Sequence, residues 1–293
     1  MSLKKLVTEA VVVDSMFDME QELMTIKESI LEQVIVEGVD DPGILKCIFM
    51  AGGPGSGKSF TAMEIFGIDK KLKSSFASTG LKSVNSDSAF ETLLKKNGID
   101  PKNLARIEKE DAELWSKITG DAPTVGTPLK IGISKRMQIA KGKSIRGRAK
   151  EITAKQKAFY EAGRLGMIID GTGHDYAKIQ KNKKKAIELG YDTYMVFVNT
   201  SLEVAQERNK NRERVLPDDL LEKSWKDVQQ NLGKFQNLFG GNFRIVDNTV
   251  YKPISGQVQK AVNKFVNKPT YNAIGKKWIK TAKALKNANI IKK

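Results

Sequence analysis

Eight consecutive residues, Gly52 to Ser59, have the types and the spacing of a phosphate-binding loop: Gly-Gly-Pro-Gly-Ser-Gly-Lys-Ser. Glycines allow sharp turns that point successive backbone N–H groups at phosphate oxygens, and a helix that starts at the end of the loop adds the positive end of its dipole. We expect Lys58 to reach the β- and γ-phosphates as a catalytic cation, and Ser59 to hold Mg²⁺ through its hydroxyl. The predicted chemistry is binding of a nucleoside triphosphate, ATP or GTP, together with Mg²⁺.

The residues on either side of this loop read as a strand and a helix. Leu45 to Ala51 form an apolar run typical of a buried strand, and strand, glycine loop and helix in this order is the setting that such a loop needs. A glycine-rich turn that binds nothing is the competing interpretation, and both flanks argue against it. The residues expected to contact the nucleotide are Gly52, Gly53, Pro54, Gly55, Ser56, Gly57, Lys58, Ser59 and Phe60.

Asp87 is the first catalytic candidate outside the loop. It follows Leu81 to Asn85, which reads as a second strand, so its carboxylate is expected at the carboxyl end of a parallel strand, where open α/β sheets bind ligands. There it would accept the proton of an acceptor hydroxyl and orient that oxygen for in-line attack on the γ-phosphate. The alternative is a cap or turn residue, because Asn-Ser-Asp-Ser is also helix-capping chemistry.

A second carboxylate, Asp170, ends an apolar run that starts at Met167 and precedes Gly-Thr-Gly-His. Nucleotide enzymes use an aspartate at this place to hold Mg²⁺, directly or through water, so Asp170 joins Ser59 as an expected metal ligand. Thr172 and His174 would project from the same edge toward the substrate. His174 is the only histidine, and a hydrogen bond to substrate or a plain loop role suits it better than acid–base catalysis.

Three arginines, Arg208, Arg212 and Arg214, crowd the end of a predicted helix just before Pro217. Arginines beside a proline hinge indicate a lid that closes over the triphosphate and neutralises the charge that develops during transfer. All three are therefore candidate catalytic residues. A solvated basic face is the alternative.

Strand and helix patterns alternate along the rest of the chain. Strands are expected at 45–51, 81–85, 167–170, 193–198 and 243–246, and helices at 87–96, 105–118, 176–189, 202–212 and 218–238. This alternation predicts an α/β fold of the P-loop NTPase type, with a parallel sheet of about five strands and helices on both faces. Helical extensions are expected at 16–34, where Gly38 and Pro42 follow, and at 258–266 and 271–285.

These elements together resemble the zeta-toxin and polynucleotide-kinase group of P-loop kinases, which have an adenylate-kinase-like core. The resemblance covers about residues 45–248 and is carried by the loop at 52–59, Asp87, the run Ile168-Ile169-Asp170-Gly171-Thr172 and the arginines before Pro217. It implies that Asp87 is the base, that Ser59 is a Mg²⁺ ligand, and that Arg208, Arg212 and Arg214 contact phosphates.

The chain also departs from that group. Zeta toxins tend to have Glu-Thr-X-Arg on the third strand, where this chain has Asp170-Gly-Thr172-Gly-His174, so the sugar-nucleotide substrate of that family does not follow directly. The run from Val196 to Glu203 looks like kinases of large tailed bacteriophages.

Charge is distributed unevenly in this chain of net charge +16. Residues 1–44 hold three lysines and ten acids, whereas residues 248–293 hold eleven lysines and no acid. Ten Lys and Arg against one Glu lie at 130–157, where Gly142 and Gly147 predict an interrupted helix and a loop facing the site. One interpretation is a nucleic-acid partner bound through 130–157 and 249–293; solvated helices, or an acidic head attracted to a basic tail, are the others.

Cys47 is the only cysteine, and its place in the first apolar run predicts a buried core thiol. A disulfide framework is therefore excluded, and a reducing cytoplasm fits, which would be the host cytoplasm if a phage encodes the chain. No apolar stretch approaches the about 20 residues of a membrane helix, so no membrane partner is expected.

We thus expect an acidic helical extension at 1–44, a P-loop kinase domain at 45–248 and a basic helical tail at 249–293. The expected function is ATP-dependent transfer of the γ-phosphate to a hydroxyl of a nucleotide, a sugar nucleotide or a similar small acceptor. The alternatives are a polynucleotide or modified-DNA kinase and a non-catalytic nucleotide-binding protein of phage assembly or the virion.

Overall fold

One parallel sheet forms the centre of the computed structural model, which describes residues 38–40, 43–67, 79–120, 144–211, 215–216, 218–250 and 256–287. The strand order is β2-β3-β1-β4-β5, and all neighbours pair in parallel. The strands are β1 (Lys46–Ala51), β2 (Lys82–Val84), β3 (Met167–Asp170), β4 (Asp192–Asn199) and β5 (Phe243–Asp247). The predicted α/β fold with a five-stranded parallel sheet is confirmed.

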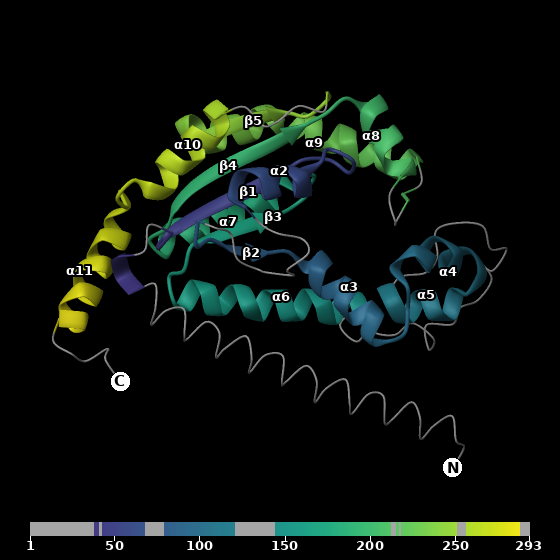
Figure 1. The fold of residues 1–293 in the computed structure, drawn as a ribbon, viewed down its shortest axis with the longest axis horizontal. Helices are drawn as coiled ribbons and strands as arrows, with labels where there is room; N and C mark the ends of the chain where they lie inside the picture. Colours follow the sequence, from purple (N-terminus) through teal and green to yellow (C-terminus); the bar gives the residue numbers. More distant parts are fainter. Residues whose placement is uncertain are drawn as a thin grey trace, which may run out of the picture.

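Helices connect these strands and cover both faces of the sheet (Figure 1). They are α2 (Lys58–Phe66), α3 (Ser86–Lys96), α4 (Leu104–Glu110), α5 (Ala112–Thr119), α6 (Ile145–Ala162), α7 (Tyr176–Glu188), α8 (Leu202–Lys210), α9 (Asp218–Phe239), α10 (Gly256–Asn267) and α11 (Ala273–Asn287). Short 3-10 turns lie at η1 (Gly38–Asp40), η2 (Pro101–Asn103) and η4 (Gly240–Asn242). None of the helices described combines the length and the hydropathy needed to cross a membrane.

Alternate residues of β1 supply the two cores on the two faces of the sheet. Cys47, Phe49 and Ala51 belong to the core that α6, α7 and α9 complete. Ile48 and Met50 belong to the core that α2 and α10 complete. Cys47 is fully buried and free, as predicted.

A third hydrophobic cluster lies apart from the sheet. Phe90 and Leu94 of α3, Trp115 of α5 and Ala149 of α6 meet there, together with Leu104 of α4. Figure 1 shows α3, α4 and α5 grouped beyond one end of the strands. These helices therefore have a core of their own beside the nucleotide loop, and α6 connects this core to the sheet.

Two expectations about helices are wrong. The helix expected at 105–118 is two helices, because Asp111 ends α4 and its carboxylate then accepts a hydrogen bond from the Leu114 N–H at 2.8 Å, which starts α5. Gly147 does not interrupt a helix, because Ser144 caps α6 by accepting from the Gly147 N–H at 3.0 Å. The rest of the loop expected at 130–157, and the helix expected at 16–34, lie outside the described residues.

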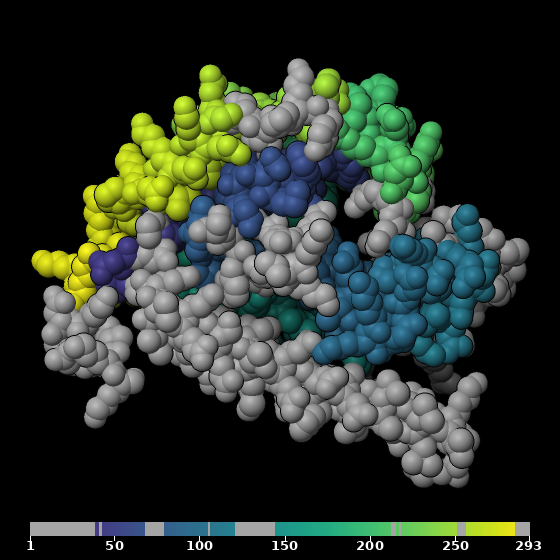
Figure 2. All heavy atoms as spheres, viewed as in Figure 1, coloured from purple at the N-terminus to yellow at the C-terminus, as the bar shows by residue number. Residues whose placement is uncertain are grey.

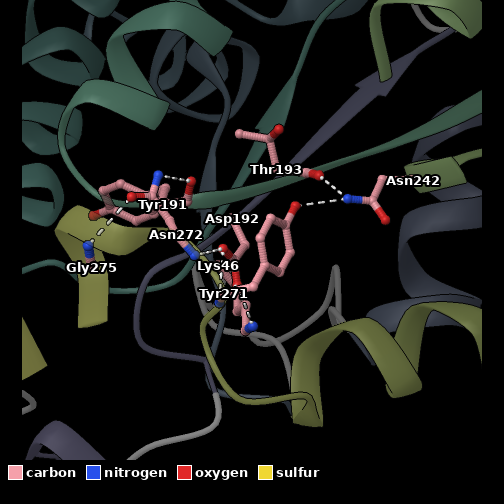
Figure 3. A network of polar contacts seen from close by, with 8 residues as sticks. All are labelled: Lys46, Tyr191, Asp192, Thr193, Asn242, Tyr271, Asn272 and Gly275. Atoms are coloured by element: carbon pink, nitrogen blue, oxygen red, sulfur yellow. Dashed lines mark hydrogen bonds and ion pairs between the residues drawn. The ribbon is translucent and has the colours of Figure 1, made fainter. Parts of the chain in front are cut away.

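The two tail helices pack on the body. Val262 and Phe265 of α10 are buried in the sheet core, where the ring centroid of Phe265 lies 4.8 Å from that of Tyr194. Between α10 and α11 the chain crosses the amino ends of β1 and β4 (Figure 3). A Cβ atom on Gly275 of α11 would overlap the Gly190 carbonyl, so this contact requires glycine. The boundary expected at 248 stays a prediction, and the described tail is part of the packed structure.

A buried ion pair anchors this crossing. Lys46 Nζ lies 2.9 Å from Asp192 Oδ2, and the two side chains are 1% and 0% exposed. Asp192 also accepts hydrogen bonds from the backbone N–H groups of Tyr271, at 3.1 Å, and Asn272, at 3.0 Å. Burial lowers the pKa of Lys46, and its hydrogen bond to Asp192 works against that shift. The carboxylate thus has three donors, which is the condition under which a buried charge is tolerated.

Asp192→Asn is expected to lower the free energy of unfolding by about 3–5 kcal/mol, because it leaves the Lys46 ammonium buried without a counter-charge. Adding Lys46→Met should recover part of that loss. Denaturant unfolding of the single and double variants measures both effects. Glu222→Gln is the matched control, because it breaks an exposed pair with Lys226 (2.6 Å, side chains 41% and 59% exposed), where less than about 1 kcal/mol is expected. Equal losses in Asp192→Asn and Glu222→Gln would contradict this assignment.

Candidate active site

The loop from Gly52 to Gly57 joins β1 to α2 at the carboxyl edge of the sheet. Gly55 and Gly57 have φ angles of 75° and 84°, a left-handed conformation that favours glycine. Gly57 is the N-cap of α2 and supplies no side-chain acceptor, so no side chain of the N-cap occupies the first N–H groups of α2. This geometry matches the predicted phosphate cradle.

Neighbouring elements fix the shape of this loop. Asn248, which follows β5, donates from Nδ2 to the Ser56 carbonyl at 2.8 Å. Arg208 of α8 donates from Nη1 to the Gly55 carbonyl at 3.4 Å. A Cβ atom on Gly55 would lie 2.6 Å from the Ala205 carbonyl oxygen, so α8 packs directly on the loop. Two elements, α8 and the residue that follows β5, thus hold the backbone of the loop in place.

Lys58 lies at the start of α2 and folds back over its own loop. Its Nζ donates to the Gly52 carbonyl at 2.7 Å. Ser59, the next residue, is exposed, and Phe60 is half-buried in the first turn of α2. Lys58 and Ser59 therefore lie where the loop ends, and their roles toward a bound triphosphate and its metal stay a prediction.

Asp170 ends β3 directly beside β1, where its Cα pairs with that of Met50. Its Oδ2 accepts from Asn85 Nδ2 at 2.9 Å, and among the described residues its buried Oδ1 has no hydrogen-bond partner. Burial raises the pKa of Asp170, the positive charge of Lys58 lowers it, and the Asp87 carboxylate raises it further. A buried carboxylate oxygen without a donor is suited to a cation.

Mg²⁺ fits this set of groups. It prefers oxygen ligands and usually takes only one or two from the protein, with phosphate oxygens and waters as the rest. Asp170 and Ser59 would supply the protein oxygens. In the described part of the chain no cluster of three or more His, Cys, Asp or Glu side chains forms a separate metal cage.

Asp87 is the second residue of α3, and its side chain is 64% exposed. The N-cap of α3 is Asn85, whose Oδ1 accepts from the Asp87 N–H at 2.8 Å. The Asp87 carboxylate is therefore not the cap of this helix. Its Oδ1 lies 2.8 Å from Nη1 of Arg146, at the start of α6.

Thr172 and His174 lie in the loop that follows β3 and runs along the start of the phosphate loop. The Gly52 N–H donates to the Thr172 carbonyl at 3.1 Å. The Thr172 hydroxyl and His174 Nδ1 are hydrogen-bonded to each other. Asn231 of α9 donates to the Gly173 and His174 carbonyls at 3.1 and 2.9 Å, which fixes the loop and leaves the His174 ring exposed.

Most predicted site residues thus lie along one edge of the sheet. Figure 2 shows a hollow beside α2, between the green atoms of α8 and the blue atoms of α3 to α5. Arg208 lies on the α8 side, against the phosphate loop, and Asp87 lies on the α3 side. Arg212 and Arg214 lie outside the described residues, so their place in a lid stays a prediction.

The sequence reasoning missed three residues of this site: Asn85, Arg146 and Asn248. Asn85 and Asn248 each follow a parallel strand, so the rule that placed Asp87 and Asp170 at the ligand edge applied to them as well. Arg146 gave no such signal. It is one of ten basic residues at 130–157, and nothing in the sequence distinguishes it from the other nine.

Comparison with known proteins gives the family. A family model described as an AAA domain (AAA_33) matches residues 47–235, which is more than half of the chain. The chain belongs to this AAA domain family. The match runs from β1 through the phosphate loop to α9, so the predicted P-loop nucleotide-binding fold is confirmed.

The AAA domain is also similar to solved structures at low identity. A chain of the AvrRxo1-ORF1:ORF2 complex has 12% identity and a TM-score of 0.43, covering 78% of this chain and 62% of that one. A chain of the same complex with ATP has 11% identity and a TM-score of 0.44, and the match covers 87% of this chain and 73% of that one. A chain of the PezAT chromosomal toxin–antitoxin system of Streptococcus pneumoniae has 11% identity and a TM-score of 0.43, and the match covers 89% of this chain and 96% of that one. This chain thus spans less than two thirds of the first structure, and no curated protein matches it.

Gly57→Ala is expected to weaken ATP binding by at least about tenfold, since a left-handed φ costs alanine about 1–2 kcal/mol and its Cβ would overlap the Asn248 amide. Calorimetric titration with ATP measures the effect. Gly233→Ala in α9 is the control, because nothing lies within 4 Å of the added methyl group, and alanine favours a helix interior. Unchanged ATP affinity in Gly57→Ala would show that the loop does not need this conformation.

Asp170→Asn is expected to stabilise the ligand-free AAA domain at neutral pH. Because the pKa of Asp170 is raised above its ordinary 3.8 in the folded protein, the folded state binds more protons than the unfolded chain from that pH upward, and the free energy of unfolding falls as pH rises through this window. Asparagine does not ionise, so the variant does not lose this part of the free energy of unfolding. The stability gain should thus be near zero at about pH 4 and positive at about pH 7 in denaturant unfolding. A variant that is less stable than wild type at neutral pH would contradict this interpretation.

Proposed function

We propose that this AAA domain is an ATP-dependent phosphotransferase that moves the γ-phosphate to a hydroxyl of a nucleotide, a sugar nucleotide or a similar small acceptor. One observation carries the proposal. Asp170 ends β3 beside β1, which leads into the phosphate loop and Lys58. Asp87 follows β2 and is linked to Asp170 by hydrogen bonds through Asn85. A protein that only bound nucleotide would not need two carboxylates beside the phosphate cradle.

The chain supplies the parts of an in-line transfer. The loop N–H groups and Lys58 would bind the β- and γ-phosphates and stabilise the charge that spreads over the transferring group. Arg208, which donates to the Gly55 carbonyl, would add a second positive charge from α8. Bound Mg²⁺, held by Ser59 and Asp170, would neutralise phosphate charge and polarise the transferring group.

Asp87 is the proposed base. Its carboxylate is exposed, and it follows β2, which lies on the far side of β3 from β1. The backbone N–H of Asp87 donates to Asn85 Oδ1, and Asn85 Nδ2 donates to Asp170. An acceptor hydroxyl that donates a hydrogen bond to Asp87 would have its oxygen oriented toward the γ-phosphate. As the new O–P bond forms and the bond to the β-γ bridging oxygen breaks, the hydroxyl proton passes to Asp87 and ADP leaves.

The acceptor class is tested with γ-labelled ATP and parallel acceptors: sugar nucleotides, nucleoside monophosphates, 5′-hydroxyl DNA and RNA, and modified DNA. Label in a small acceptor supports the proposal. Label in nucleic acid alone would replace it with the polynucleotide-kinase alternative, for which the exposed lysines of α10 and α11 offer a binding surface. No transfer to any acceptor would favour the non-catalytic binder. Lys58→Ala should abolish transfer in each case, because it removes the cation nearest the transferring group.

Asp87→Asn is expected to lower turnover by about 10² or more while ATP affinity persists, since asparagine keeps the size of the side chain but cannot accept the proton. Steady-state rates and ATP titration separate the two effects. The control is Asp100→Asn, a cap residue of η2 outside the site. Loss of ATP affinity with turnover per bound nucleotide kept would make Asp87 a structural or metal residue instead.

A further inference from the structure

Arg146 lies against Asp87, the proposed base, beside the third hydrophobic cluster. It is the second residue of α6, and its side chain is only 24% exposed. Nη1 lies 2.8 Å from Asp87 Oδ1, and the guanidinium carbon lies 4.8 Å from the centroid of the Phe90 ring. The guanidinium is therefore covered on one face by an aromatic ring and pinned at one end by a carboxylate.

The position of this guanidinium is fixed by packing. The Ser144 cap sets the start of α6, and Ala149, one turn later, is buried with Phe90 in the cluster core. Arg146 and Asp87 thus belong to helices that pack on each other, and their separation does not depend on a flexible loop. A site built on helices keeps its geometry better than one built on loops.

The contact with Asp87 leaves most of the donors of Arg146 unused. A guanidinium carries five N–H donors, and one carboxylate oxygen takes only part of this capacity. Nη1 lies 2.8 Å from Asp87 Oδ1 as an ion pair, but the geometry is not that of a hydrogen bond. Within the described residues, this buried nitrogen therefore has no hydrogen-bond acceptor. The planar fork of arginine matches carboxylate and phosphate oxygens, and it is the usual choice for binding phosphate where the site is partly dry.

We propose that Arg146 is the anion-binding residue of the acceptor site and that the acceptor carries a phosphate group close to the hydroxyl that reacts. The hydroxyl donates to Asp87 while the neighbouring phosphate takes the free N–H groups of Arg146. An acceptor without a phosphate gives the guanidinium no other partner than Asp87. The guanidinium and the acceptor hydroxyl then compete for the same carboxylate. The site therefore selects a phosphorylated sugar or nucleotide over the same molecule without its phosphate. The acceptor role of this site rests on the proposed function, whereas the anion site itself does not.

Binding of inorganic phosphate tests the site without turnover. The full chain is first saturated with a non-hydrolysable ATP analogue, so that the phosphate loop is occupied, and phosphate is then titrated by calorimetry. Arg146→Gln should weaken phosphate binding by about tenfold or more, whereas Asp87→Asn should tighten it, because it removes the competing carboxylate. Lys150→Gln is the matched control: it removes the same charge from an exposed position one turn along α6 and should change little. Equal phosphate affinity in wild type and Arg146→Gln, or no phosphate binding in the loaded wild type, overturns the proposal.

Paired acceptors test selectivity. Uridine and UMP, or ribose and ribose 5-phosphate, differ only by the phosphate. In wild type the phosphorylated member should have a kcat/KM at least about tenfold higher, and Arg146→Gln should reduce this preference through KM while the KM for ATP is unchanged. A preference that survives Arg146→Gln overturns the assignment. If no acceptor is labelled but phosphate binding still depends on Arg146, the phosphotransferase proposal fails and the anion site stands.

Discussion

The parallel pairing of β1 with a strand on each side is the constraint on which the rest of the structure depends. β1 pairs with β3 so that Met50 lies beside Asp170, and with β4 so that Ala51 lies beside Phe197. Because parallel strands all end at one edge, the phosphate loop after β1, Asp170 at the end of β3 and Asn248 after β5 lie along the same edge. A shift of one residue in the β1–β3 register would turn the Asp170 side chain to the other face of the sheet and separate it from Asn85.

The sequence was sufficient to predict this edge because each of its parts has a local signature. A glycine loop after an apolar run, and an aspartate after another, are visible without any knowledge of what lies beside them. Arg146 and Asn248 could not be found in that way, since their importance comes from a partner far along the chain: Asp87 for one and Ser56 for the other. The two wrong helix predictions have the same origin on a smaller scale, because a single capping side chain, Ser144 or Asp111, decided each boundary.

Two carboxylates at opposite edges of the sheet, Asp192 and Asp170, differ in how their charge is compensated. At the amino edge of the sheet, Asp192 has Lys46 and two backbone N–H groups as donors, so its charge is fully compensated and serves stability. At the carboxyl edge, Asp170 has one donor on Oδ2 and none, among the described residues, on Oδ1. An unsatisfied buried oxygen destabilises a ligand-free protein, and such local costs concentrate at functional sites. The contrast between the two edges separates the part of the sheet that is built for stability from the part that is built for chemistry.

The anchoring of α11 on the amino edge also sets the order in which the protein can be completed during synthesis. Lys46 and Asp192 lie on strands that are translated before the tail. The two backbone N–H groups that donate to the Asp192 carboxylate belong to Tyr271 and Asn272, which are translated later. Until that segment emerges, the sheet carries an incompletely satisfied charge and lacks the apolar cover of Val262 and Phe265. The nucleotide loop is translated long before then. A chain that ended before α10 would therefore carry the phosphate loop on a sheet that has α2 on one face but lacks the apolar cover of α10 there.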